Sequence, residues 1–279
     1  MSHAVSVAAL AFVLTCGMGF SATADVVKDA QAAYDRADYN EAYRISQAAA
    51  EKGNAGAQYT LGVLYAKGQG IALDIQQAKR WYEKAAAQGH TGAQISLGAL
   101  YLTGLGVPKD YTQAAAWFRK AADRGDPGGQ NNLALMYDKN RGVPQDFAQA
   151  IALFSAAAER GYAPAQNNLG YMHEKGRGTL ENFSEALRWY TMAADQGYPE
   201  AQENLGHMYA KGRGVVQDLV RAHMWYDLAS RYFPQNEARS REMAAARRKA
   251  VAREMTPAQI GQAKELAQAW RPTVRATKP

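Results

Sequence analysis

A pattern that returns every 36 residues constrains this chain more than any other feature of its sequence. Five glutamines, five glycines and five alanines mark equivalent places: Gln58, Gln94, Gln130, Gln166 and Gln202; Gly70, Gly106, Gly142, Gly178 and Gly214; Ala78, Ala114, Ala150, Ala186 and Ala222. Self-similarity at such a period is the signature of a solenoid, in which each copy packs on its neighbours. The sequence therefore predicts one continuous repeat array over residues 55–230.

Each copy is predicted to fold as two helices. In the first copy Gln58, Leu61 and Tyr65 are spaced as one face of a helix. The second helix should begin at Asp74, because a glutamine three residues later completes a capping box that recurs with the period. Gly68 follows the first helix, where a left-handed residue commonly ends a helix. The predicted fold class is all-α.

A pair of bulky residues in each second helix predicts the core between copies. Small residues recur around these pairs and let the helix backbones approach closely, so the side chains are expected to fill the remaining space. The pairs are Trp81/Tyr82, Trp117/Phe118, Leu153/Phe154, Trp189/Tyr190 and Trp225/Tyr226.

The repeated string AxAQxxLGxxYxxGxGVxxDxxxAxxWYxxAAxxGx resembles the Sel1-like repeat, a relative of the tetratricopeptide repeat. The resemblance covers five copies, with local departures at Ala134, Asn140, Leu153 and His173. It implies a right-handed α-solenoid of antiparallel helix pairs, with the first helices on the concave side, and a scaffold or adaptor function. The copies are residues 55–90, 91–126, 127–162, 163–198 and 199–230.

Both ends of the array are expected to differ from the repeats, because terminal repeats cap the stack. Residues 25–54 match the second half of a copy and are predicted to be a degenerate first repeat. Residues 231–270 are predicted to form two capping helices, the second marked by Thr256 and Pro257. Residues 271–279 are predicted to be a flexible tail.

Residues 1–24 resemble a secretory signal peptide. Positions 4–20 are apolar and uncharged, and Ala22 and Ala24 form a small-residue cleavage site, so we expect a periplasmic or secreted protein that begins at Asp25. An uncleaved membrane anchor is the alternative. Cys16, the only cysteine, leaves a cleaved chain without disulfides. A lipid on Cys16 is disfavoured because Thr15 precedes it.

The excess positive charge lies in the C-terminal part. Residues 226–279 hold 11 basic and 5 acidic side chains, whereas the rest of the chain is balanced. This segment is expected to be a solvated helix or a weak contact for an anionic surface, and nucleic acid is not an expected partner of an exported chain. Its clustered cations are Arg239, Arg241, Arg247, Arg248, Lys249 and Arg253.

The sequence contains no motif that indicates catalysis, a metal or a cofactor. Its histidines lack metal-ligand spacing, and the zinc-protease, nucleophile-elbow and phosphate-loop patterns are missing. The chain also lacks the cysteine pairs of the Sel1-like proteins described as penicillin-binding or weakly β-lactam-hydrolysing. A cell-wall enzyme or β-lactam binder therefore stays a second hypothesis, and a membrane-tethered adaptor a third.

The first helix of each copy has two positions that change from copy to copy and lie off the recurring face. Such positions line the groove of a solenoid, and aromatic choices there favour binding over plain surface. We therefore expect a non-enzymatic scaffold that binds a protein or peptide in this groove. The predicted contact residues are Tyr59, Val63, Ile95, Asn131, Leu135, Asn167, Tyr171, Glu203 and His207.

Overall fold

The computed structural model describes residues 23–273, with side chains from Val26 onward. This range contains fourteen helices and no strand, which confirms the all-α prediction. The helices are α1 (Thr23–Asp35), α2 (Tyr39–Glu51), α3 (Ala55–Lys67), α4 (Ile75–Ala87), α5 (Thr91–Thr103), α6 (Tyr111–Asp123), α7 (Pro127–Lys139), α8 (Phe147–Glu159), α9 (Ala163–Lys175), α10 (Phe183–Ala194), α11 (Pro199–Lys211), α12 (Leu219–Tyr232), α13 (Ala238–Ala252) and α14 (Pro257–Ala269).

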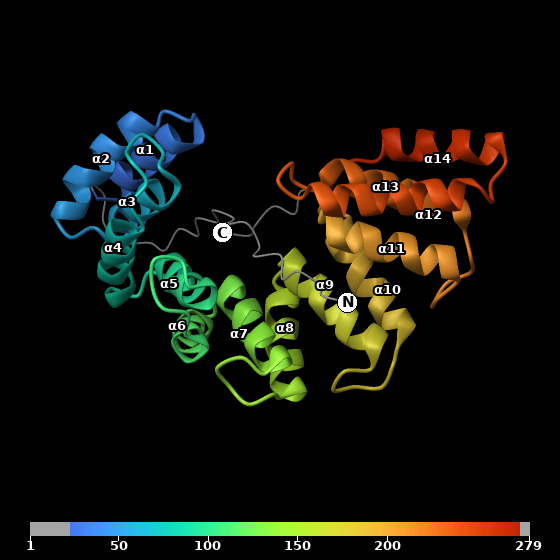
Figure 1. Ribbon diagram of the computed structural model, residues 1–279, viewed down its shortest axis with the longest axis horizontal. Coiled ribbons are helices and arrows are strands. Elements are labelled where there is room, and N and C mark those ends of the chain that lie inside the picture. Colours follow the sequence, from blue (N-terminus) through green and yellow to red (C-terminus); the bar gives the residue numbers. More distant parts are fainter. Residues whose placement is uncertain (1–22, 274–279) are drawn as a thin grey trace. The chain divides into compact units, whose positions relative to one another are not determined.

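The chain divides between Gln145 and Asp146 into two compact units. In the first unit α1 to α7 stack in chain order, each helix on the next, and in the second unit α8 to α12 do the same (Figure 1). Both α13 and α14 pack on α12 and so close the second unit. Within residues 23–273, no helix is long and apolar enough to cross a membrane.

The second helix of each repeat begins at a polar side chain. Asp74 accepts a hydrogen bond from the backbone N–H of Gln77 at 3.0 Å. Such a bond satisfies one of the backbone donors that have no partner inside the helix. The predicted cap at Asp74 is confirmed, but the predicted capping box is wrong, because the N–H of Asp74 donates to the carbonyl of Tyr65 at 3.0 Å and not to Gln77. Among the described helices, the two-way box forms at Thr256 and Gln259 of α14. The equivalent caps are Asp110, Asp146, Asn182 and Asp218.

The first helix of each repeat ends in a left-handed residue. Gly68 has φ 63° at the end of α3, and glycines take this place in three other repeats. Asn140 ends α7 with φ 55°, and its side-chain oxygen accepts a hydrogen bond from the N–H of Gln145 at 3.1 Å. Asparagine tolerates this conformation, so the departure from glycine preserves the turn.

A glycine in the first helix makes room for the aromatic ring of the second. A Cβ on Gly62 would stand 2.4 Å from Cε1 of Tyr82, which is closer than atoms can pack. The equivalent pairs are Gly98/Phe118, Gly170/Tyr190 and Gly206/Tyr226. These rings are buried, which confirms the second member of each predicted pair as core.

The first member of the pair is half-buried in three repeats, which corrects the prediction for Trp81, Trp117 and Leu153. Both indoles are half-buried, and the Nζ atoms of Lys84 and Lys120 stand 4.1 and 3.7 Å from their ring centroids. The lysines cover these rings where no neighbouring helix does. The equivalent Trp189 and Trp225 are buried.

The recurring glutamine joins one repeat to the one before it. Nε2 of Gln58 donates to the carbonyl oxygen of Ala50 at 3.2 Å, in the last turn of the preceding helix. The same contact is made by Gln94, Gln166 and Gln202. These buried bonds satisfy carbonyls at a helix end and explain why this residue type recurs.

The predicted signal peptide, including Cys16, lies in residues outside the described range except at its end, where Thr23 begins α1. At the other terminus α14 presents Ala263 and Ala267 to the core, and Trp270 packs 6.2 Å from Trp225 between ring centroids. The start of the predicted flexible tail is held in place, because the backbone N–H of Thr273 donates to the carbonyl of Asp195 at 2.7 Å.

Candidate partner-binding face

Five of the side chains predicted to line a groove lie in the first unit, and three of these five are buried. Tyr59, Val63 and Asn131 are 8, 2 and 3% exposed, so their prediction as open contact residues is wrong. Ile95 and Leu135 are half-buried. None of these five therefore offers a large free surface.

Tyr59 shows why repeat variation misidentified this face. Its ring lies 4.5 Å from the ring of His90 between centroids and 5.8 Å from that of Tyr82. A Cβ on Gly92 would stand 3.0 Å from Cζ of Tyr59, so the start of α5 covers the ring. A position that varies between copies can therefore be a contact between successive first helices.

The second unit holds the other four predicted residues at half-buried positions of α9 and α11. Nδ2 of Asn204 donates to Oδ1 of Asn167 at 2.9 Å, which joins the two helices. Glu203 forms an ion pair with Arg247 of α13, with its Oε1 2.6 Å from Nη1, so α13 contributes to the same surface. Tyr171 and His207 lie one turn after Asn167 and Glu203.

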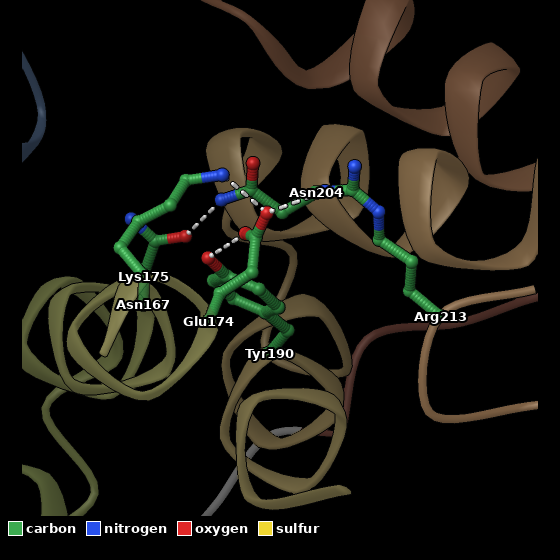
Figure 2. A network of polar contacts seen from close by, with 6 residues as sticks. All are labelled: Asn167, Glu174, Lys175, Tyr190, Asn204 and Arg213. Carbon is green, nitrogen blue, oxygen red and sulfur yellow. Dashed lines mark hydrogen bonds and ion pairs between the residues drawn. The ribbon is translucent and has the colours of Figure 1, made fainter. Parts of the chain in front are cut away.

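Glu174 is the centre of a polar network between these helices (Figure 2). Its side chain is 6% exposed, and its Oε2 accepts a hydrogen bond from the phenol of Tyr190 at 2.9 Å. Its Oε1 pairs with Nζ of Lys175 at 2.6 Å and with Nη1 of Arg213 at 3.4 Å. The buried carboxylate is therefore matched on both oxygens, as a buried charge requires.

The network shifts the pKa values of Glu174 and of the neighbouring His207. Burial by itself raises the pKa of Glu174, but hydrogen bonds from Lys175 and Tyr190 lower it below its ordinary value overall. The pKa of His207 is lowered by burial and then by the positive charge of Arg213, with Arg247 and Lys175 adding to the effect, while Glu174 opposes it. His207 thus lies in a surrounding where cations outweigh anions.

We call this surface the α9–α13 face and define it by Asn167, Tyr171, Lys175, His207, Arg213 and Arg247. The sequence did not predict Lys175 or Arg213 of this face, nor the buried Glu174 that holds them. One signal was present: Glu174 occupies a repeat position that is Ala66, Leu102 and Ala210 in three other copies. A carboxylate at a position that is apolar in these three copies, and that is the buried Asp138 in the remaining copy, indicates a polar network.

Part of the positive charge of the basic helix α13 is neutralised by ion pairs within the protein. Arg247 pairs with Glu203, and Arg248 pairs with Asp227, which is 3% exposed and also contacts Arg231. The other members of the predicted cluster, Arg239, Arg241, Lys249 and Arg253, are exposed.

Among residues 23–273, no group of three histidine, cysteine, aspartate or glutamate side chains is arranged to hold a metal ion. A shallow hollow of about 530 Å³ lies on α4 in the first unit, and it does not pair a nucleophile with a base. Its lining residues are Gln77, Arg80, Trp81, Glu83, Lys84 and Ala87.

Comparison with solved structures finds the same architecture in two bacterial proteins. A Sel1 repeat protein from Oxalobacter formigenes is 26% identical and matches 91% of this chain and 99% of its own length, with a TM-score of 0.71. The c5321 protein, a protective antigen present in uropathogenic Escherichia coli strains, is 27% identical and has a TM-score of 0.53. That match covers 89% of this chain and 60% of c5321.

No curated protein sequence matches the chain. The Sel1 repeat family model matches six consecutive segments that together span most of it, including the degenerate first repeat. They are residues 28–54, 55–90, 91–126, 127–162, 163–198 and 199–231. On these repeats and this architecture, the chain belongs to the Sel1 repeat family.

Proposed function

We propose that the chain is a non-enzymatic scaffold that holds an extended segment of a partner protein across the α9–α13 face. Sel1 repeat proteins are generally scaffolds for protein interaction. The observation that carries the proposal is the Asn167–Asn204 pair beside Tyr171, because it combines backbone-matching amides with an aromatic anchor on one half-exposed surface.

The two amides suit a peptide backbone. A side-chain amide carries two N–H donors and an oxygen acceptor, and the bond between Asn204 and Asn167 uses one donor and one acceptor. Nδ2 of Asn167 and the oxygen of Asn204 keep capacity to bond a peptide C=O and N–H. Such contacts recognise an extended segment without selecting its side chains.

Tyr171 supplies binding area next to these amides. Nζ of Lys175 stands 5.8 Å from the centroid of its ring, so the phenol borders the cationic part of the face. Tyrosine is enriched among residues that dominate binding energy, because its ring buries a large area at small entropic cost. We infer that a partner side chain packs on this ring.

The test is selection of a phage-displayed library of random dodecapeptides on the immobilised full chain, followed by affinity measurement on synthesised winners. Replacing Asn167 and Tyr171 together by alanine should weaken the winning peptides by about 1–3 kcal/mol, because an anchor and a backbone contact are lost. The chain should stay folded with a lower melting temperature, because both side chains are half-buried and Tyr171 also packs against the core of the second unit.

A matched control replaces Ser184 and Glu181, both exposed near the start of α10, by alanine. Full affinity in the control and loss in the Asn167/Tyr171 variant support the face. Failure to enrich any peptide, or equal affinity in both variants, would contradict the proposal.

We further propose that the scaffold acts in the periplasm or outside the cell. Support comes from the apolar residues 4–20 and the small residues Ala22 and Ala24. Intact-mass measurement of the chain expressed in a bacterial host should give a protein that begins at Asp25. A dominant species that keeps Met1 would instead favour the membrane-tethered alternative.

A further inference from the structure

The α9–α13 face separates its charges by depth. The carboxylates lie underneath, with the side chains of Glu174 and Glu203 6 and 13% exposed. The cations lie above them, with the side chains of Lys175, Arg213 and Arg247 42, 41 and 47% exposed. An approaching partner therefore meets positive charge first, although the local sum is nearly balanced.

Lys175 and Arg213 converge on one atom, Oε1 of Glu174. The longer of the two contacts, 3.4 Å to Arg213, engages one of the five N–H donors of the guanidinium. Lys175 likewise keeps donors after its contact at 2.6 Å. Two cations with open donors are thus held side by side by a single buried carboxylate.

The anchoring of Glu174 keeps this pair of cations in place. The phenol of Tyr190 fixes the other carboxylate oxygen at 2.9 Å, and Tyr190 is fully buried. Because side-chain order is established before binding, an incoming group that accepts hydrogen bonds loses less free energy to ordering. His207 borders the same place, where burial and then the positive charge of Arg213 lower its pKa.

We propose that the partner segment carries an aspartate or glutamate side chain whose carboxylate binds between Lys175 and Arg213. This rests on the proposed function of the α9–α13 face and names the chemistry of its occupant. A carboxylate accepts hydrogen bonds from an arginine fork and a lysine together, and charge-assisted bonds of this kind are the stronger ones.

The experiment uses the full chain and the same random dodecapeptide library at low ionic strength. Winning peptides should share an acidic residue at one position, and changing that residue to its amide should weaken binding about tenfold, the effect of roughly 1.4 kcal/mol. Arg213→Ala and Lys175→Ala should each cost a similar factor. In those variants the acid-to-amide change in the peptide should have little further effect.

Arg239→Ala is the matched control, because Arg239 is an exposed arginine of α13 outside the face. Arg213→Lys, which keeps the positive charge, should retain part of the affinity for the peptide. It keeps the test valid if the alanine variant fails to fold. Winners that depend on Asn167 and Tyr171 but are neutral or basic would overturn this inference alone. Equal loss in Arg239→Ala and Arg213→Ala would also overturn it, since binding would then follow overall charge.

Discussion

The phenol of Tyr190 donates a hydrogen bond to the carboxylate of Glu174 across the α9–α10 pair, at 2.9 Å and out of contact with solvent. Tyr190→Phe removes this donor and leaves the ring in place. We expect the free energy of unfolding to fall by about 1.5–3 kcal/mol, the usual worth of a hydrogen bond to a charged group. Urea denaturation followed by circular dichroism measures the change.

Tyr226→Phe provides the matched control at the equivalent position of the next repeat. Its ring is equally buried against Gly206, and within the described residues its hydroxyl has no hydrogen bond. The control should therefore be nearly neutral. Equal losses in the two variants would show that the bond to Glu174 adds no stability of its own.

Glu200 near the start of α11 predicts a pH dependence of stability. Burial raises its pKa to about 7, with repulsion from Glu237 and Glu203 in the same direction, and its Oε2 is buried without a hydrogen bond. The folded chain therefore binds a proton between about pH 4.5 and 7 that the unfolded chain releases. This contribution to stability is complete below about pH 4.5 and is lost as pH rises through 7.

Glu200→Gln should accordingly raise the melting temperature at pH values above about 7 and change it little near pH 4.5. Thermal unfolding across this range measures the effect. The exposed Glu265→Gln in α14 is the control and should leave the profile unchanged. A melting temperature of Glu200→Gln that follows the natural chain at every pH would refute the assignment.

Much of the fold could be predicted because helix caps, turn glycines and buried rings each depend on residues close in sequence. Asp74 and Gln77, or Thr256 and Gln259, need no knowledge of the rest of the chain. The candidate face was harder to predict, because contacts that hold it together join residues far apart in sequence: Asn167–Asn204 are 37 positions apart and Glu203–Arg247 are 44 positions apart. Repeat variation predicted three of its members, Asn167, Tyr171 and His207, but also selected Tyr59, which the next repeat buries.

The pair Trp117/Phe118 of repeat 91–126 contains one core residue and one partly exposed residue. Phe118 is 1% exposed against Gly98, so Phe118→Ala should lower the free energy of unfolding by about 3–5 kcal/mol. Trp117 is half-buried under Lys120, so Trp117→Ala should cost clearly less, about 1–2 kcal/mol. Chemical denaturation of both variants gives the ranking, and a larger loss for Trp117 would reverse the assignment.

Gly70, the loop glycine that recurs every 36 residues, is predicted to be required for stability. Gly70 has φ 69°, and a Cβ there would stand 2.5 Å from the carbonyl oxygen of Tyr39 at the start of α2. Gly70→Ala therefore combines a disfavoured backbone conformation with a clash against backbone and should lower the free energy of unfolding by about 2 kcal/mol or more.

Gly261 in α14 provides the contrast, because a Cβ there meets nothing within 4 Å and the residue is helical. Gly261→Ala should stabilise by about 0.5–1 kcal/mol, since alanine favours a helix and restricts the unfolded chain. Equal and small effects of the two substitutions in urea denaturation would show that the loop glycine does not set the spacing between repeats.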